Sequence, residues 1–241
     1  MKLSVLELCP VPTGELAGEA LRRSVDLARH VEPWGYRRFW VAEHHGLPGI
    51  ASSAPAVLAG QIAAATSAIR VGSGGVMLPN HPPLTVAEQF GTLEAMYPGR
   101  IDLGVGRAPG TDRATARVLG RGSVTDFPAQ LAELQGYFGP GQVRAIPAEG
   151  NRPAVWLLGS TGYSAELAGQ LGLPFAFAYH FSAANARPAL ALYPAGVPAT
   201  VAAQLGELVA ATGADELMVT TSTFAQAARL ASYELLTRAT S

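Results

Sequence analysis

The chain has 241 residues, of which 49% are hydrophobic and 15% charged, and its formal net charge is −1 at pH 7. This composition excludes a disordered chain, and the near-neutral charge gives no electrostatic reason to expect nucleic acid or an anionic membrane as partner. Cys9 is the only cysteine, which excludes an internal disulfide and a thiolate zinc site. Because Glu7 interrupts the apolar N-terminal segment and no apolar run approaches membrane-spanning length, we expect a cytoplasmic protein without a membrane span.

Short β-branched or aromatic runs alternate along the chain with longer segments of helical period, which is the pattern of parallel βα units. The expected strands, in chain order, are Leu3–Leu8, Arg38–Glu43, Ile69–Met77, Ile101–Gly106, Ala154–Gly159, Phe175–His180 and Glu216–Thr221. The expected helices lie near residues 20–35, 53–67, 82–97, 127–138, 164–172, 183–193, 198–212 and 224–239. We therefore predict one α/β domain over residues 1–241, built as a TIM-type (β/α) barrel.

An eight-stranded barrel needs one strand more than the seven expected here. The gap falls after Tyr193, where two helical segments are separated only by residues 194–198. The barrel therefore either closes with seven strands or stays open. An open edge would favour a homodimer, because an unpaired strand edge is a liability.

The second strand ends in Glu43-His44-His45, at the strand ends where α/β barrels hold their active sites. Side chains alternate along a strand, so at most one of the two histidines faces the barrel mouth, and the parity of Trp40 and Ala42 favours His44. The alternative is that both histidines only hydrogen-bond the rim. Ligands on one face of a strand are spaced by two, as in His-x-His, so the adjacent pair argues against a metal hydrolase and we expect no metal.

The third strand contains Gly72, Gly74 and Gly75 in close succession. Glycines weaken a strand and are expected where a ligand approaches the backbone closely or where the strand bulges. A planar ring lying across the barrel mouth would need such a bare surface. An ordinary β-bulge explains the same residues, so both interpretations stay open at this point.

The fourth strand is followed by Arg107, within a Gly-x-Gly-x-x-x-Gly run that begins at Gly104. This spacing differs from the dinucleotide fingerprint, so we do not expect a nicotinamide cofactor. A guanidinium at a strand end is well suited to a phosphate group. A structural ion pair of Arg107 with Asp102 or Asp112 is the alternative.

The fifth strand runs into the small turn Thr161-Gly162-Tyr163-Ser164, which opens a helix. Its backbone N–H groups and the positive end of the helix dipole would suit a phosphate. Plain N-capping by a hydroxyl side chain is the alternative. Tyr179, near the end of the sixth strand, adds an aromatic group to the same rim, and we count it with the four turn residues as candidates for cofactor binding.

Taken together, these groups suit a phosphorylated ring compound, with one histidine as the acid–base group. The order of residues indicates no Ser-His-Asp triad, no pair of catalytic carboxylates and no cysteine nucleophile.

Several runs of residues together resemble the luciferase-like monooxygenases, in particular those of actinobacteria. These runs are Val41–His45, Gly72–Pro79, Ala87–Phe90, Gly99–Arg107 and Leu171–Pro174. The resemblance covers residues 1 to about 193 and resumes from about 196 to 239. It implies a TIM-type barrel that takes reduced FMN from a separate flavin reductase and uses molecular oxygen to oxidise a small organic substrate.

The resemblance also implies roles for individual residues. It makes His44 the acid–base group near the flavin. Gly74 and Gly75 match the strand segment under the isoalloxazine ring, which often has a non-proline cis peptide. Arg107 matches a phosphate-binding arginine, and residues 161–164 fall in the phosphate loop.

The chain departs from the family pattern by an internal truncation after about residue 193. Typical members carry another strand, a lid region and extra helices between the parts that match here as Tyr193 and Gly196. Those segments usually shield the site from water. Two alternatives to a monooxygenase therefore stay open: a non-catalytic flavin-binding protein that forms dimers, and a deazaflavin-dependent oxidoreductase of the same superfamily.

Overall fold

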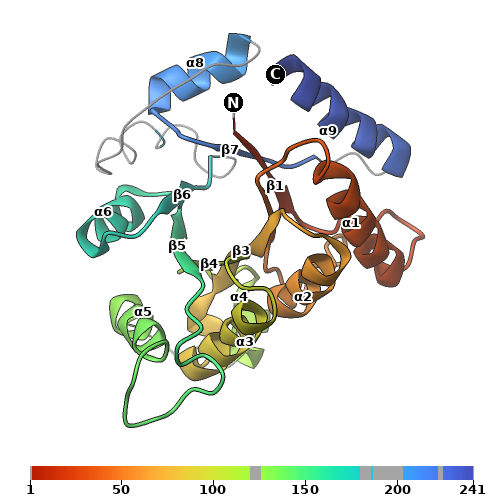
Figure 1. Cartoon of the computed structure of the whole chain (residues 1–241). Helices are drawn as coiled ribbons and strands as arrows, with labels where there is room; N and C mark the ends of the chain where they lie inside the picture. The colour runs from red at the N-terminus through yellow and green to blue at the C-terminus, as the bar shows by residue number, and fades with distance from the viewer. Residues whose placement is uncertain (1, 120–125, 180–185, 187–202, 222–224, 241) are drawn as a thin grey trace.

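The computed structural model describes residues 2–119, 126–179, 186, 203–221 and 225–240. These residues form a seven-stranded parallel sheet in the order β6-β5-β4-β3-β2-β1-β7, with helices around its outer side (Figure 1). The strands are β1 (Leu3–Glu7), β2 (Arg38–Val41), β3 (Arg70–Met77), β4 (Ile101–Gly106), β5 (Ala154–Gly159), β6 (Phe175–Phe177) and β7 (Leu217–Val219). The seven predicted strands are confirmed. Several end one to three residues early, where the parallel pairing stops.

The helices follow the strands in the order that βα units require. They are α1 (Ala17–Val31), α2 (Pro55–Ala65), α3 (Pro83–Met96), α4 (Arg113–Val118), α5 (Phe127–Gly136), α6 (Gly162–Leu171), α8 (Ala203–Thr212) and α9 (Gln226–Thr240), with a 3-10 turn η1 (Leu78–Asn80) after β3. The sequence did not predict α4, a six-residue helix with no buried residue that begins after its N-cap, Asp112. Apart from Ala186, the helix predicted over residues 183–193 lies outside the described residues.

The sheet has the strand order of a TIM-type barrel but stays open over the described residues. Strand β1 pairs in parallel with both β2 and β7, so that Val5 lies opposite Phe39 on one side and Val219 on the other. In this part of the chain β6 pairs with β5 alone and β7 with β1 alone. The predicted TIM-type fold is therefore confirmed, and over the described residues the barrel lacks one strand and is open between β6 and β7.

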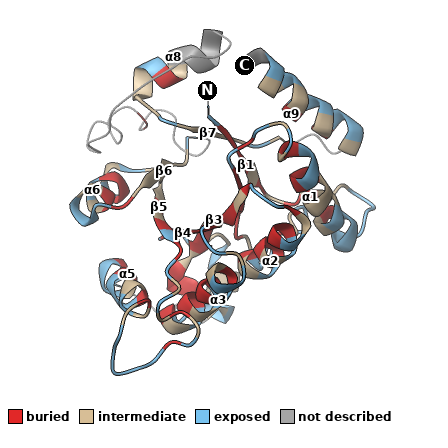
Figure 2. Ribbon diagram, in the orientation of Figure 1, coloured by how far each residue is buried: buried red, intermediate tan, exposed pale blue. Residues whose placement is uncertain are grey.

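The hydrophobic core lies between the sheet and the helices outside it. Phe39, Val41, Leu103, Val105 and Leu157 alternate along β2, β4 and β5 and are fully buried. Helices α2 and α3 contact β2, β3 and β4, and Figure 2 shows the buried residues on these strands and on the helix sides that face them. This arrangement leaves the strand ends as the place for chemistry. None of the described helices has the length and apolarity needed to span a membrane.

The other face of the sheet carries a buried polar network around Asp102 on β4. Its carboxylate accepts hydrogen bonds from Arg38 Nη1 at 2.7 Å, from Trp40 Nε1 at 2.9 Å and from Arg70 Nη2 at 2.7 Å. The Arg38 guanidinium also lies 4.5 Å from the centre of the Trp156 ring. Charge pairing therefore joins β2, β3 and β4 at the amino ends of the strands.

At the same end of the barrel, Glu32 follows α1 and holds the start of β3. Its Oε1 atom accepts hydrogen bonds from the backbone N–H groups of Ser67, Ala68 and Ile69 at 2.8, 2.7 and 2.9 Å. Burial works against the ionised carboxylate, but these three hydrogen bonds outweigh it and lower the pKa of Glu32.

We expect Glu32→Gln to destabilise the protein near neutral pH and to matter less in acid. Because the folded pKa of Glu32 lies below the unfolded value, its contribution is fully present above the unfolded pKa and is lost as the pH falls through the folded pKa. The effect should not exceed about 1 kcal/mol, since solvent screens a partly exposed carboxylate. Urea unfolding across pH measures it, with Glu88→Gln on α3 as control. If the difference in unfolding free energy between the wild type and Glu32→Gln did not change with pH, this expectation would be contradicted.

Candidate functional site

The loops that follow β2 and β4 meet at the carboxyl ends of the strands and hold His44 between them. The backbone N–H of His44 donates to the Ser52 carbonyl at 2.9 Å, and its ring Nδ1 lies 3.3 Å from the Gly110 carbonyl. A carbonyl oxygen only accepts, so this contact places the proton of a neutral imidazole on Nδ1 and leaves a lone pair on Nε2. The half-buried His44 therefore has one ring nitrogen suited to exchanging a proton.

Contacts from the β4 loop fix the backbone around His44. The His45 N–H donates to the Gly110 carbonyl at 3.3 Å, and the His45 carbonyl accepts from Thr111 Oγ1 at 2.6 Å. Gly110 has φ +63°, and a side-chain Cβ at this position would lie 2.7 Å from the Glu43 carbonyl oxygen. Only glycine combines that backbone conformation with so close an approach.

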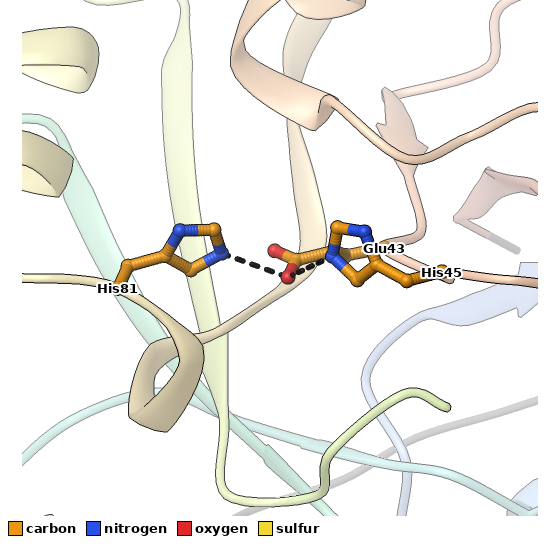
Figure 3. Close-up of side chains that lie close together, drawn as sticks. All are labelled: Glu43, His45 and His81. Carbon is orange, nitrogen blue, oxygen red and sulfur yellow. Dashed lines mark hydrogen bonds and ion pairs between the residues drawn. The ribbon is translucent and has the colours of Figure 1, made fainter. Parts of the chain in front are cut away.

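Glu43 is the centre of a buried hydrogen-bond cluster that the sequence did not predict. Its Oε1 accepts from His45 Nε2 at 2.9 Å and from His81 Nε2 at 2.8 Å, while its Oε2 accepts from the Met77 N–H at 3.1 Å (Figure 3). Glu43 itself is fully buried. The cluster therefore ties the end of β2 to the end of β3 and to the turn that follows it.

The cluster also sets the charge state of Glu43. Burial opposes ionisation, but the hydrogen bond and charge of His81, the hydrogen bond from His45 and that from the Met77 N–H together lower the pKa of Glu43. Glu43 is thus a carboxylate at neutral pH. His45 is bound to it, which leaves His44 as the member of the predicted histidine pair outside this cluster.

The glycines of β3 have a steric explanation within the sheet. A Cβ on Gly74 would lie 2.7 Å from Leu6 Cδ1, and a Cβ on Gly75 would lie 2.6 Å from the Gly104 carbonyl oxygen. The Gly74–Gly75 peptide bond is cis, as the family resemblance implied, and the pairing register with β4 shifts here. The irregular strand is therefore observed, and contact of these glycines with a ligand stays a prediction.

The two elements predicted to bind phosphate lie together. The guanidinium carbon of Arg107, directly after β4, is 4.7 Å from the centre of the Tyr163 ring in the first turn of α6. Asp102 and Asp112, the two alternative partners of Arg107, are engaged elsewhere: Asp102 binds Arg38 and Arg70, and Asp112 caps α4. The end of β4 and the start of α6 thus meet, and we call Arg107 together with Tyr163 the cationic corner.

In the part of the chain that the structure describes, helix α6 begins at Gly162 without a capping hydrogen bond from its N-cap side chain. Thr161 occupies the N-cap position in an extended conformation, and within the described residues its side chain makes no capping hydrogen bond. Ser164 is buried against β5, where a Cβ on Gly159 would lie 2.3 Å from Ser164 Oγ. Capping by Thr161, one of the alternatives drawn from the sequence, is thus not observed, and the first N–H groups of a helix, here beginning with Gly162, have no carbonyl partner within the helix.

Tyr179 lies two residues beyond the end of β6 and is 45% exposed. The predicted strand extended to His180, but β6 ends at Phe177, and the Tyr179 N–H donates to the Phe177 carbonyl at 2.9 Å instead of continuing the strand pairing. His180 lies outside the described residues. A contact between Tyr179 and a cofactor stays a prediction.

Comparison with known proteins relates the chain to one enzyme family. A model of the luciferase-like monooxygenases matches residues 1–138. The uncharacterized protein YvbT of Bacillus subtilis is 64% identical over 198 residues, and a luciferase-like monooxygenase of Escherichia coli is 54% identical over 197 residues. Each alignment covers 79% of this chain and 59% of the relative. An N-acetyl-S-alkylcysteine monooxygenase of Bacillus subtilis is 43% identical and is covered over 57% of its length, against 74% of this chain.

Solved structures agree with this relationship. The crystal structure of apo-MsnO8 superposes with a TM-score of 0.90 at 33% identity, covering 99% of this chain and 97% of that one. The oxygenating constituent of 3,6-diketocamphane monooxygenase from Pseudomonas putida, solved with FMN, gives a TM-score of 0.62 at 17% identity over 73% of this chain and 56% of that one. An F420-dependent secondary alcohol dehydrogenase gives 0.53 at 18% identity over 70% and 55%. The last two likenesses concern the fold alone.

Proposed function

The chain belongs to the luciferase-like monooxygenase family, and on this premise we propose that it is a flavin-dependent monooxygenase that oxidises a small organic substrate with molecular oxygen. The observation that carries the proposal is the cationic corner of Arg107 and Tyr163 at the start of α6, on the same strand-end side of the sheet as His44. We further propose a single domain, a homodimeric assembly and a separate reductase as the source of reduced flavin.

The residues of this corner fit the phosphate of a flavin nucleotide. Arg107 supplies a permanent positive charge, and the N-terminal turn of α6 supplies backbone N–H groups and a helix dipole. On the neighbouring strand, Gly74 and Gly75 carry no side chain, and Gly74 is partly exposed whereas Gly75 is buried. We propose that this backbone lies against the ring system and that Tyr179 contacts the cofactor from β6.

When bound, reduced flavin supplies the two electrons that activate oxygen. The chain supplies positioning and proton transfer. We propose that His44 gives or accepts a proton at Nε2 during oxidation of the substrate, since its Nδ1 is engaged by Gly110. The contacts of Gly110 and Thr111 with His45 hold the adjacent backbone, so the imidazole needs little reorganisation.

FMN is the cofactor we favour over a deazaflavin. The named relative at 43% identity is a monooxygenase, whereas the F420-dependent dehydrogenase is only 18% identical, and oxygen chemistry requires a flavin that reacts with oxygen. Binding of both cofactors to the same preparation separates the two assignments. Stable uptake of the deazaflavin alone would replace FMN in this proposal.

We expect Arg107→Gln to weaken FMN binding by roughly 10- to 100-fold, the amount that loss of a charge-assisted hydrogen bond costs. Riboflavin, which has the same ring but no phosphate, should bind the variant and the wild type equally. Fluorescence titration with both ligands measures the two affinities. Arg113→Gln on α4, which also removes one exposed arginine, is the matched control. An equal loss for FMN and riboflavin would contradict a phosphate contact and leave Arg107 a structural role.

Catalysis is tested by supplying reduced FMN and following oxygen uptake with and without substrate. An N-acetyl-S-alkylcysteine is the first probe, because a relative is named for acting on that class. The alignments span 59% of the length of the first two curated relatives. The same experiment therefore also tests the alternative, a flavin-binding protein without catalytic activity. Flavin binding without oxidation of any probe would favour a non-catalytic flavin-binding protein.

A further inference from the structure

The cluster around Glu43 is a second candidate site, and its residues are distinct from those assigned to flavin. We propose that Glu43, His45 and His81 bind a divalent metal ion of the zinc class at the carboxyl ends of β2 and β3. The inference rests on these three side chains alone and does not depend on the proposed oxidation.

The donor atoms are those that zinc and neighbouring transition metals prefer. One carboxylate oxygen and one imidazole nitrogen from each histidine all lie within 4.8 Å of one another. Two histidines and one carboxylate form a known three-ligand zinc set in which water completes the coordination. Calcium and magnesium take oxygen ligands instead, so imidazole donors disfavour them.

The ligands are held by contacts outside the set, as metal ligands usually are. The Met77 N–H binds Glu43 Oε2, which leaves Oε1 turned toward both imidazoles. Thr111 holds the backbone of His45, and the His81 N–H donates to the Leu78 carbonyl at 3.0 Å. Figure 3 shows the two rings approaching the carboxylate from opposite sides, each with Nε2 directed at it.

The cluster has a buried anion and an accessible side. The Glu43 side chain is 0% exposed, whereas those of His45 and His81 are 17% and 30% exposed. A cation can therefore enter past the imidazoles and meet a carboxylate that bulk water does not screen. A metal would replace the two N–H···O hydrogen bonds with two metal–nitrogen bonds and one metal–oxygen bond, and the proton on Nε2 of each imidazole would leave for solvent while Nδ1 takes up or keeps a proton, so that each bound ring is neutral.

Binding of one ion by all three donors requires the two imidazole rings to move. The imidazole nitrogens lie 2.9 and 2.8 Å from Oε1, which are hydrogen-bond distances. Ligands about 2.0–2.1 Å from one tetrahedral zinc ion lie about 3.3 Å apart. Each ring would therefore move away from Oε1 by a few tenths of an ångström, and the two rings, which approach the carboxylate from opposite sides, would turn toward a shared ion.

One sequence feature is consistent with this proposed site, namely the spacing of Glu43 and His45, but only the adjacent pair His44 and His45 entered the sequence-based expectation. The expectation of no metal considered His44 with His45, which lie on opposite sides of an extended chain. Glu43 and His45 are spaced by two, and that spacing places both side chains on one side. His81 joins them from the turn after β3, a contact that strand spacing alone does not reveal.

The test is zinc binding to the tag-free full-length chain after treatment with a chelator and without flavin. We expect isothermal titration calorimetry to give one Zn²⁺ per chain, and Co²⁺ to give the intense visible spectrum of a tetrahedral site. His81→Gln and His45→Gln should each weaken Zn²⁺ binding at least about 10- to 100-fold, the range found even for residues that support ligands indirectly. His30→Gln, an exposed histidine on α1, should bind as the wild type does.

Absence of stoichiometric Zn²⁺ binding, or wild-type affinity in both His81→Gln and His45→Gln, would overturn the proposal. A weak octahedral Co²⁺ spectrum would overturn it too, and this measurement needs no variant. Zn²⁺ should also raise the unfolding temperature of the wild type but not of His81→Gln, because a ligand stabilises only the state that binds it. Since flavin is absent throughout, a negative result leaves the proposed oxidation untouched.

Discussion

His44→Ala should lower the rate of flavin-dependent substrate oxidation by roughly 10²- to 10⁴-fold, the usual contribution of a positioned acid–base group. Flavin affinity should stay unchanged, because the predicted phosphate contacts lie on Arg107 and α6 and the ring contacts on β3. The ring of His44 contacts the Gly110 carbonyl through Nδ1, so its removal costs the scaffold one hydrogen bond of ordinary strength. We therefore expect the His44→Ala variant to fold and to bind flavin, but to oxidise the substrate slowly.

The measurement is oxygen uptake coupled to substrate oxidation, with FMN affinity determined on the same preparation. Added imidazole should restore part of the rate of His44→Ala, because a free acid–base group can enter the space that the side chain leaves. His30→Ala, which removes an exposed histidine from α1, controls for surface effects. An unchanged coupled rate in His44→Ala would remove this residue from the mechanism.

The strands could be predicted from the sequence because buried strands have recognisable local patterns of apolar residues. Apolar residues alternate or run together in β2, β4 and β5, and glycine or proline separates them from the helices. Counting strands placed the missing strand between the sixth and the seventh, but it left open whether the barrel closes, and the open edge between β6 and β7 comes from the structure. Helix α4 was missed because it is short, buries no side chain and depends on a cap, Asp112, that resembles any exposed aspartate.

Sequence patterns pointed to individual candidate residues of the site. They did not reveal contacts between residues that are far apart in the sequence. Arg107 and the turn before α6 could be picked out separately, and the structure adds the contact between Arg107 and Tyr163. The cluster around Glu43 required knowing that the turn after β3 folds back over the end of β2. That contact depends on the paths of two loops, which side-chain periodicity does not specify.

Asp102 illustrates the same limit, because the sequence offered it as a partner for Arg107 and the structure gives it to Arg38 and Arg70. Register explains the difference. Asp102 lies opposite Gly72 on β3, near the amino end of β4, whereas Arg107 follows the carboxyl end of that strand. The absence of a side chain at Gly72 lets the backbone and Cβ of Asp102 lie there, since a Cβ on Gly72 would lie 2.0 Å from the Asp102 carbonyl oxygen and 2.8 Å from its Cβ.

Asp102→Ala should lower the free energy of unfolding by about 3 kcal/mol, the lower end of the range for removing one partner of a buried ion pair, because Arg38 keeps its contact with Glu216. The carboxylate is fully buried and Arg38 is 6% exposed, so water cannot take over the lost interactions of that guanidinium. Asp102→Asn keeps the shape and removes the charge, and we expect a loss of similar size. Asp112→Ala, which removes an exposed helix cap, should cost much less.

Urea unfolding measures these losses, and added FMN separates stability from binding. Because Asp102 and the predicted phosphate contacts lie at opposite ends of β4, saturating FMN should raise the stability of Asp102→Asn and of the wild type by the same increment. A smaller increment in the variant would mean that the Asp102 network also shapes the flavin site. A loss no larger than that of Asp112→Ala would mean that Arg38 finds a substitute partner, for which Glu216, 3.1 Å from Arg38 Nε, is the nearest carboxylate already in contact.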